Sequence, residues 1–276
     1  MCIRDRTSWD YIAIAGVLIA GVPHGGFDGA VARRSGWPLL EQGWILFHAS
    51  YLLLAVLVAI AWLSAPGIAL TLFLSISAIH FGASDIRAVD RPWQWHCVLP
   101  LTAHSGLVCV AIPGLHPDLV LPLFNILVGE TAALSILGGI SCLIIPWLLV
   151  VTIYLIYACF VKHWKRSAFL LAVLLVGCFW LDPLVSFAIY FCFIHSPQHS
   201  LRIWRSLTPS DRKRCFLEAA AYTLAAWIMA LLLMALLNRP GGPDFDSLLI
   251  QLTFVGLASL TVPHMILVDL IDLKND

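Results

Sequence analysis

The sequence has little charge: Asp, Glu, Lys and Arg make up only 12% of its 276 residues, and the formal net charge is zero. An ordinary soluble domain carries about 25% charged residues. In contrast, 61% of this chain is hydrophobic and its mean hydropathy is +0.91. A soluble fold is therefore excluded. The basic residues are scattered over short loops and form no stripe that could follow a phosphate backbone, so nucleic acid is not an expected partner.

The eight cysteines contain no C-x-x-C pair. Most of them stand inside apolar runs, where cysteine behaves as a small hydrophobic residue, so neither a disulfide framework nor a zinc knuckle is indicated. No small-residue cleavage site follows the first apolar run, and the N-terminus therefore does not resemble a removed signal peptide. Met1 to Arg6 are expected to be foreign to the native protein, and residues 1–8 are expected to be non-native or disordered.

Long apolar runs, by contrast, recur along the whole chain. A membrane-spanning helix needs about 20 mostly apolar residues. Candidate spans lie at roughly 11–32, 43–63, 67–84, 95–112, 131–161, 167–181, 183–201, 216–237 and 247–271. The sixth run is short, and the break at Leu181-Asp182-Pro183 could join the sixth and seventh into one kinked segment. We predict an all-α, polytopic integral membrane helical bundle with eight or nine transmembrane helices, forming a single transmembrane domain over residues 1–276.

The distribution of lysine and arginine predicts the orientation of these helices, because cytoplasmic loops collect basic residues. With nine crossings and the loop after the first helix inside, 13 of the 16 basic residues lie inside. Only Arg4, Arg6 and Arg239 then lie outside. We expect a multi-pass protein of the cell (inner) membrane whose N-terminus is outside and whose C-terminus is cytoplasmic.

Ionisable side chains at membrane depth are costly, and their default interpretation is functional. The most specific signal among the ten histidines is the segment His195-Ser196-Pro197-Gln198-His199. If this segment is α-helical, its two imidazoles share one face and could bind one ion. A zinc protease would need H-E-x-x-H, but Ser196 stands where that motif has its glutamate, so this mechanism of peptide hydrolysis is disfavoured.

Three further phrases each place an aspartate four or five residues after a histidine: His24 with Asp28, His80 with Asp85, and His264 with Asp269. In the nine-crossing arrangement, the four helices that carry these phrases and the His195 segment all run in the same direction. Each has its histidine in its inner half, so the imidazoles can lie at one depth. Imidazoles from several helices of a bundle can build a metal site in its core, and imidazole suits iron, copper or zinc. The pattern predicts a metal site at His24, His80, His195 and His199.

The aspartates matter because a metal-binding histidine usually donates its second ring N–H to a carboxylate or a carbonyl. Asp28 can share the face of His24, whereas Asp85 and Asp269 turn away from their own histidines and could serve a histidine of a neighbouring helix. Simple solvation at a helix end would explain these two aspartates equally well. His264 is a candidate additional ligand or a supporting residue, although a histidine bonded to a carbonyl is an equally good interpretation.

The remaining histidines lack such phrases. His48 could reach the predicted depth, whereas four others are interpreted as structural: His96, His104, His116 and His163. Glycines adjoin the motif histidines at Gly25, Gly26 and Gly82, where small residues let helices or a rod-like ligand approach closely.

The phrases that begin at Pro23, His80, His195 and Pro263 resemble those of the Brp/Blh family of bacterial and archaeal membrane β-carotene 15,15′-dioxygenases. The resemblance covers nearly the whole chain, in order and spacing. It implies a non-haem iron(II) enzyme that uses O2 to cleave the central 15,15′ double bond of β-carotene. The expected products are two molecules of all-trans-retinal, with a microbial rhodopsin as a retinal acceptor. By position, the catalytic iron histidines of the family would be His24, His80, His195 and His199.

Two other functions remain open from the residues alone. A metal-ion or proton transporter also uses intramembrane histidines and aspartates to relay its cargo. A lipid hydroxylase or desaturase places histidines at membrane helix ends, but such enzymes resemble a di-iron pattern with several H-x-x-H-H clusters, and the sequence contains none.

Overall fold

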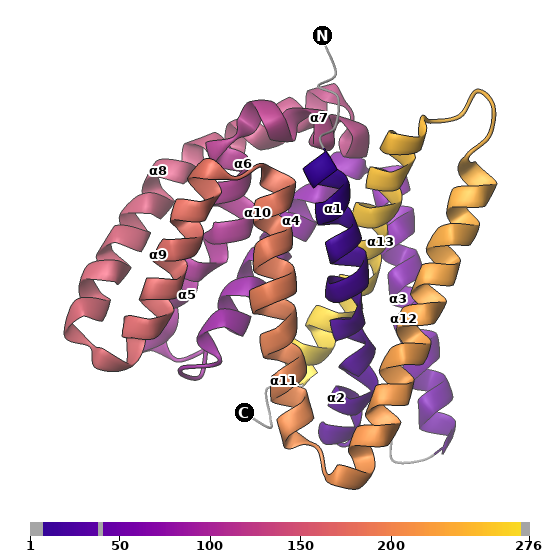
Figure 1. Cartoon of the computed structure of the whole chain (residues 1–276), viewed down its shortest axis with the longest axis horizontal. Coiled ribbons are helices and arrows are strands. Elements are labelled where there is room, and N and C mark those ends of the chain that lie inside the picture. Colours follow the sequence, from indigo (N-terminus) through magenta and orange to yellow (C-terminus); the bar gives the residue numbers. More distant parts are fainter. Residues whose placement is uncertain (1–7, 38–40, 272–276) are drawn as a thin grey trace. The chain divides into compact units, whose positions relative to one another are not determined.

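The computed structural model describes residues 8–37 and 41–271, and these residues form helices joined by short turns, without a β-strand. Figure 1 shows the course of the chain. The predicted all-α class is therefore confirmed. Residues 1–7, which include the segment expected to be foreign, lie outside the described residues, and Ser8 begins the first helix.

The first half of the chain contains α1 (Ser8–Gly16), η1 (Val17–Gly21), η2 (Val22–Phe27), α2 (Asp28–Arg34), α3 (Glu41–Ser64), α4 (Pro66–Ile86), η3 (Trp95–Cys97), α5 (Val98–Gly106), η4 (Leu107–Ala111), α6 (Ile112–Leu115) and α7 (Pro117–Val128). The second half contains α8 (Glu130–Phe160), η5 (Lys162–Trp164), α9 (Lys165–Trp180), α10 (Pro183–Ile189), η6 (Tyr190–His195), α11 (Ser196–Ser206), α12 (Pro209–Leu237), α13 (Phe245–Ile266) and η7 (Leu267–Ile271).

The chain divides into two compact units. The first unit consists of the described residues up to Ile14 together with Leu70–His195, and in it α8 packs against α5, α7 and α9. The second unit consists of Ala15–Ala69 and the described residues from Ser196 onward, and in it α13 packs against α3 and α12. The single transmembrane domain expected from the sequence stays a prediction.

Seven helices of the described chain are long and apolar enough to cross a membrane: Ser8–Arg34, Gly43–Ser64, Pro66–Ile86, Trp95–Leu115, Glu130–Phe160, Pro209–Leu237 and Phe245–Asp269. The sequence predicted eight or nine. The difference lies in the expected sixth and seventh spans: α9 has only 16 residues, and the run from Pro183 to Ser206 includes the polar helix α11.

The outer faces of the long helices are apolar, as lipid contact requires. Large side chains such as Leu52 and Leu53 on α3 are about three-fifths exposed, and Leu231 and Leu232 on α12 are more than half exposed. In water such continuous apolar surfaces would drive aggregation. A helix that is apolar on all sides is instead typical of a membrane span, so the structure agrees with a multi-pass membrane protein.

Changes of helix type follow the prolines. Three of the four π-helical stretches in the described residues, η1, η4 and η6, each end two residues before a proline, at Pro23, Pro113 and Pro197. A proline has no N–H to donate to the carbonyl four residues earlier, and its ring crowds that carbonyl. A wider π turn accommodates this defect. Because η1 precedes His24 and η6 ends on His195, the spacing of these histidines cannot be interpreted with ideal α-helical geometry.

Candidate functional site

Three of the predicted histidines come together in the second unit. His24 lies on η2, His199 on α11 and His264 on α13, and their side chains are 5%, 1% and 2% exposed. The ring centroids lie 5.8 Å apart for His24 and His199 and 5.0 Å apart for each of the other two pairs. All three pairs meet edge to face. Three imidazoles from three separate segments therefore converge in a buried space.

The polar contacts of Asp28 explain the orientation of His264. His264 Nδ1 donates to Asp28 Oδ1 at 2.6 Å, and the Tyr51 hydroxyl donates to Asp28 Oδ2 at 2.8 Å. We call these three residues the second-unit triad. Since Nδ1 carries the proton in this arrangement, Nε2 is the ring nitrogen through which His264 could bind a metal. Donor atoms of Asp28, His199 and His264 lie within 4.8 Å of one another, which is compact enough for one ion.

The expectation that Asp28 shares a face with His24 assumed an α-helix. The structure instead has a 3-10 helix over Val22–Phe27, followed by α2, which begins at Asp28. A 3-10 helix has three residues per turn, so a residue four positions later points in a different direction. The carboxylate of Asp28 is hydrogen-bonded to His264, whose position is 236 residues later in the sequence.

Nearby groups also contact the other two histidines of this cluster. His24 Nδ1 lies 2.5 Å from the carbonyl oxygen of Gly21, which is a suitable acceptor for a ring N–H. His199 Nδ1 lies 3.2 Å from Arg202 Nη2. An arginine can only donate, so Nδ1 of His199 accepts in this arrangement. Binding a metal through Nε2 would require His199 to change tautomer and give up its bond with Arg202.

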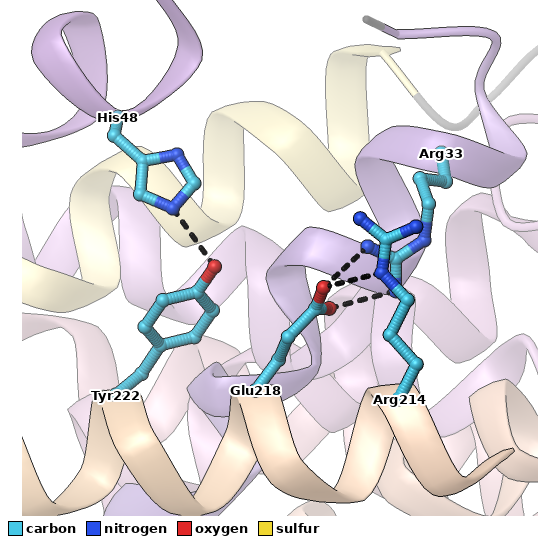
Figure 2. Close-up of polar contacts among 5 residues, drawn as sticks. All are labelled: Arg33, His48, Arg214, Glu218 and Tyr222. Atoms are coloured by element: carbon cyan, nitrogen blue, oxygen red, sulfur yellow. Dashed lines mark hydrogen bonds and ion pairs between the residues drawn. The ribbon is translucent and has the colours of Figure 1, made fainter. Parts of the chain in front are cut away.

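The polar residues along one face of α12 tie that helix to α2 and α3 of the second unit (Figure 2). Glu218 accepts two bonds from the guanidinium of Arg33, at 2.9 and 2.7 Å, and one from Arg214 Nε at 2.8 Å. One turn further along, the Tyr222 hydroxyl lies 2.8 Å from His48 Nε2. Bidentate arginine–carboxylate pairs combine energy with fixed geometry. His48, which the sequence placed near the depth of the motif histidines, therefore contributes to a contact between helices.

A close approach at Gly26 completes this packing. A Cβ atom added there would lie 2.8 Å from the Cα and the carbonyl oxygen of Ala219 on α12, which is closer than real Cβ contacts allow. Gly25, by contrast, has no atom within 4 Å of such a Cβ. The predicted role of glycine in close packing thus applies to Gly26 in the second unit, where it presses the segment with His24 onto α12.

The remaining two motif histidines come together in the first unit. His80 on α4 and His195 at the end of η6 are 2% and 1% exposed, and their ring centroids lie 5.2 Å apart. Three aromatic rings surround His195. Phe81 meets it edge-on at 4.9 Å, Phe191 stacks on it at 5.6 Å, and Tyr190 lies at 6.1 Å. We call these three rings the aromatic cage.

A second triad of tyrosine, aspartate and histidine lies in the first unit. The Tyr190 hydroxyl donates to Asp85 Oδ1 at 3.0 Å, and His104 Nδ1 donates to Asp85 Oδ2 at 3.1 Å. The Ser167 hydroxyl lies 2.9 Å from His104 Nε2. We call Tyr190, Asp85 and His104 the first-unit triad. Asp85 thus serves a histidine of the next helix, and His104, which the sequence analysis interpreted as structural, is part of this hydrogen-bond network.

The sequence did not single out Tyr51, Tyr190 or Ser167 as partners of the motif residues. Each stands in a helix distant in sequence from the aspartate or histidine that it contacts, so no spacing rule connects them. The one signal available was a hydroxyl-bearing side chain inside an apolar run. Asp269 lies on η7 and is 8% exposed, and its role beside the histidines stays a prediction.

A further group of potential metal donors lies between α4 and α5 in the first unit. His96 Nε2 donates to Asp90 Oδ2 at 2.9 Å, and Cys97 contributes a buried thiol nearby. The pKa of the Asp90 carboxyl is lowered, mainly by its hydrogen bond with His96. The two side chains are 38% and 31% exposed, so solvent screens their attraction. We interpret this group as an ion pair that closes the loop.

Both histidine groups suit a metal ion by the chemistry of their donors. Neutral imidazole nitrogens bind iron, copper and zinc, and four of the five motif histidines expose 2% or less of their surface. In the second-unit cluster, His199 and His264 belong with Asp28 to one group of donor atoms that lie within 4.8 Å of one another. Asp28 supplies the carboxylate support that metal-binding histidines commonly have. The residues of the described chain therefore fit the iron that the sequence resemblance implied.

Comparisons with known proteins give consistent matches. The family model described as Beta-carotene 15,15'-dioxygenase matches residues 15–272. A protein of uncultured marine bacterium 66A03, named Beta-carotene 15,15'-dioxygenase, is 34% identical over 267 residues, which cover 95% of this chain and 94% of that protein. A protein of Halobacterium salinarum, named Probable beta-carotene 15,15'-dioxygenase Blh, is 26% identical over 289 residues, which cover 94% of this chain and 83% of that protein. No solved structure matches.

Proposed function

Because the chain belongs to the β-carotene 15,15′-dioxygenase family, we propose that it cleaves the central double bond of β-carotene with O2 to give two molecules of all-trans-retinal. The resemblance found in the sequence is thereby confirmed, and the chain is a carotenoid-cleaving dioxygenase. The single observation that supports the proposed reaction and its retinal products is that five motif histidines are buried in a chain of this family.

We propose that iron(II) is the cofactor and that His24, His80, His195 and His199 hold it. The edge-to-face contact of His24 with His199 and that of His80 with His195 support this assignment. His264 is either a further ligand or a neighbour that orients the others, and the metal content of its variants separates these roles. When bound, the iron would supply the redox chemistry with O2, which no protein side chain can provide.

The contribution of the chain itself is position and exclusion of water. The imidazoles are neutral donors, so they would leave the ferrous site with positive charge. Asp28 and Tyr51 fix the ring of His264, and the aromatic cage fixes the ring of His195. A dry, apolar surrounding protects reactive intermediates from water and suits a hydrocarbon substrate that arrives through the bilayer. No side chain is required as a nucleophile or as an acid–base pair.

The cellular setting follows from the same proposal. We place the protein in the cell (inner) membrane with a cytoplasmic C-terminus, on the basis of its basic loops. Membrane lipid surrounds it, and a microbial rhodopsin is the proposed acceptor of the retinal. A fluorescent protein that folds only in the cytoplasm, fused after Asp276, should fluoresce, and a dark, membrane-inserted fusion would contradict the orientation.

The proposal is tested in bacteria that make β-carotene. Expression of the chain should remove the orange colour and produce retinal in the extract, whereas the His195→Ala variant should leave the carotene intact. Persistent carotene beside well-folded, iron-loaded protein would instead favour a metal-ion transporter. The observation that favours this second function is the presence of two buried histidine–aspartate pairs, because transporters use such intramembrane residues to relay their cargo.

A further inference from the structure

The first-unit triad is a buried polar group that the proposed chemistry does not use. The side chains of His104 and Asp85 are 3% and 7% exposed, and Tyr190 is 2% exposed. Every polar atom that joins them has a suitable partner. Tyr190 and His104 each donate to a different oxygen of Asp85, and Ser167 donates to the remaining ring nitrogen of His104. Such a network is costly to bury unless it is fully bonded, and when fully bonded it fixes geometry.

The placement of the triad relates it to the histidines of the first unit. Asp85 stands five residues after His80 on α4, and Tyr190 stands five residues before His195 on η6. The hydrogen bond between Asp85 and Tyr190 therefore joins the same two segments that carry His80 and His195. A metal ion bound by both histidines would bridge these segments at a second point.

Tyr190 also touches the histidine directly through its ring. It lies 6.1 Å from His195 with an interplanar angle of 30°, and it meets Phe81 edge-on at 5.4 Å. Phe81 in turn contacts His195 at 4.9 Å and His80 at 5.8 Å. Of the three rings in the aromatic cage, Tyr190 alone has a polar group that can anchor it. Its hydroxyl is fixed to Asp85 and, through Asp85, to α5.

We propose that Tyr190 and Asp85 are positioning residues that hold His80 and His195 at a fixed separation before any metal binds. The inference deepens the proposed function, and it rests on that function for the identity of the metal. The reason is preorganisation: when two ligands are already in place, metal binding need not order them. Loss of the anchor should therefore weaken metal binding, while the fold and the contact with the substrate persist.

The variant that tests this is Tyr190→Phe, which removes the hydroxyl and keeps the ring in the aromatic cage. Metal-free protein in detergent would be titrated with Co(II), whose visible absorption reports ligand geometry, and anaerobically with Fe(II). We expect the metal affinity of Tyr190→Phe to fall about tenfold, the lower end of the range for partners that orient metal ligands. With saturating iron, kcat should return to within about twofold of wild type, and KM for β-carotene should not change.

The matched control is Tyr154→Phe. Tyr154 is fully buried in the same unit and packs its ring 5.6 Å from His104, but it does not belong to the aromatic cage. Its variant loses an equally buried hydroxyl and should keep the metal affinity within about twofold. A second pair of variants separates geometry from charge. Asp85→Asn can still accept from Tyr190 and bond the other His104 tautomer, so it should bind metal more tightly than Asp85→Ala.

The outcomes are distinguishable. If wild type binds Co(II) and Fe(II) and Tyr190→Phe binds them equally well, the positioning role is wrong and the dioxygenase proposal stands. If both tyrosine variants lose stability without losing metal affinity, the network is only structural and the inference is overturned. If wild type binds neither metal, the iron proposal itself fails and takes the inference with it. If excess iron restores the activity of Tyr190→Phe and KM for β-carotene is unchanged, the positioning role is supported.

Discussion

The two units use the same three residue types in the same bonding pattern, yet the histidine faces different surroundings in each: Tyr51, Asp28 and His264 in the second unit, and Tyr190, Asp85 and His104 in the first. In both, the histidine donates through Nδ1 to one carboxylate oxygen and the tyrosine donates to the other. In the second unit the ring of His264 meets His24 and His199. In the first unit Nε2 of His104 is bonded by Ser167, and the tyrosine contacts the motif histidine instead.

Under the proposed function, a buried histidine–aspartate pair does not by itself indicate a metal ligand. What matters is the partner of the second ring nitrogen. A hydroxyl in hydrogen-bond contact makes that nitrogen part of a structural network, whereas a neighbouring cluster of imidazoles makes it a candidate ligand. By this criterion His264 of the second-unit triad is a candidate ligand beside His24 and His199, and the first-unit triad is proposed to support His80 and His195 of its own unit through Tyr190.

The largest expected effect is the loss of one motif histidine in either unit. His195→Ala removes a first-unit donor and His199→Ala removes a second-unit donor, so each should reduce retinal formation to background and reduce bound iron. Retinal in extracts and iron per purified chain are the measurements. If one of the two variants kept both at wild-type levels, that unit would not contribute to the metal centre.

The next effect separates the two triads directly. His264→Ala should lower metal affinity or activity by about 10–100-fold, because it removes a ring that contacts two proposed ligands. His104→Ala should lower them by less than about tenfold and mainly reduce thermal stability, since it leaves Asp85 with one bond fewer. Metal titration and unfolding temperature would be measured for both. Equal losses of metal affinity in the two variants would remove the distinction between the triads.

Substituting a closely packed glycine with alanine should have a smaller effect, a loss of stability of similar size in both units. Gly26→Ala would bring Cβ to 2.8 Å from Ala219, and Gly82→Ala would bring it to 2.7 Å from the carbonyl oxygen of Leu101. Each should cost about 1–3 kcal/mol of unfolding free energy, the usual range for overpacking. Gly25→Ala, which meets no atom within 4 Å, should leave stability nearly unchanged and serves as the control. Thermal unfolding in detergent checks the series.

The sequence predicted the all-α fold and most of its long helices well, because these depend on local composition, whereas the metal-binding role of the motif histidines stays a prediction. Apolar runs marked the long helices, and Asp182 with Pro183 marked the break before α10. The partners of the histidines were not predictable in the same way. The π and 3-10 turns next to Pro23 and Pro197 rotate the side chains that follow them. Residue spacing alone therefore predicted that Asp28 supports His24, whereas the hydrogen bond of Asp28 is with His264.

The smallest expected effect concerns the ion pair of Asp90 and His96, which lies at the surface and contrasts with the buried triads. The pKa of Asp90 is lowered in the folded protein, chiefly by its hydrogen bond with His96. Its contribution to stability is therefore present above the unfolded pKa of about 3.9 and is lost as the pH falls through the lower folded value. Asp90→Asn should remove this acid dependence, worth less than about 1 kcal/mol. Unfolding at pH 5 and pH 3 would show it, and an unchanged acid dependence in the variant would contradict the assignment.

We propose that buried histidines of this chain would hold an iron ion, which would supply the redox chemistry for cleaving a carotenoid. The most direct measurement uses purified, metal-free protein that is reloaded anaerobically with Fe(II) and then given β-carotene and O2. Two retinals per β-carotene consumed, with no product from the metal-free protein, is the predicted result. Cleavage that proceeds equally well without iron, or iron-loaded protein that yields no retinal, would contradict it.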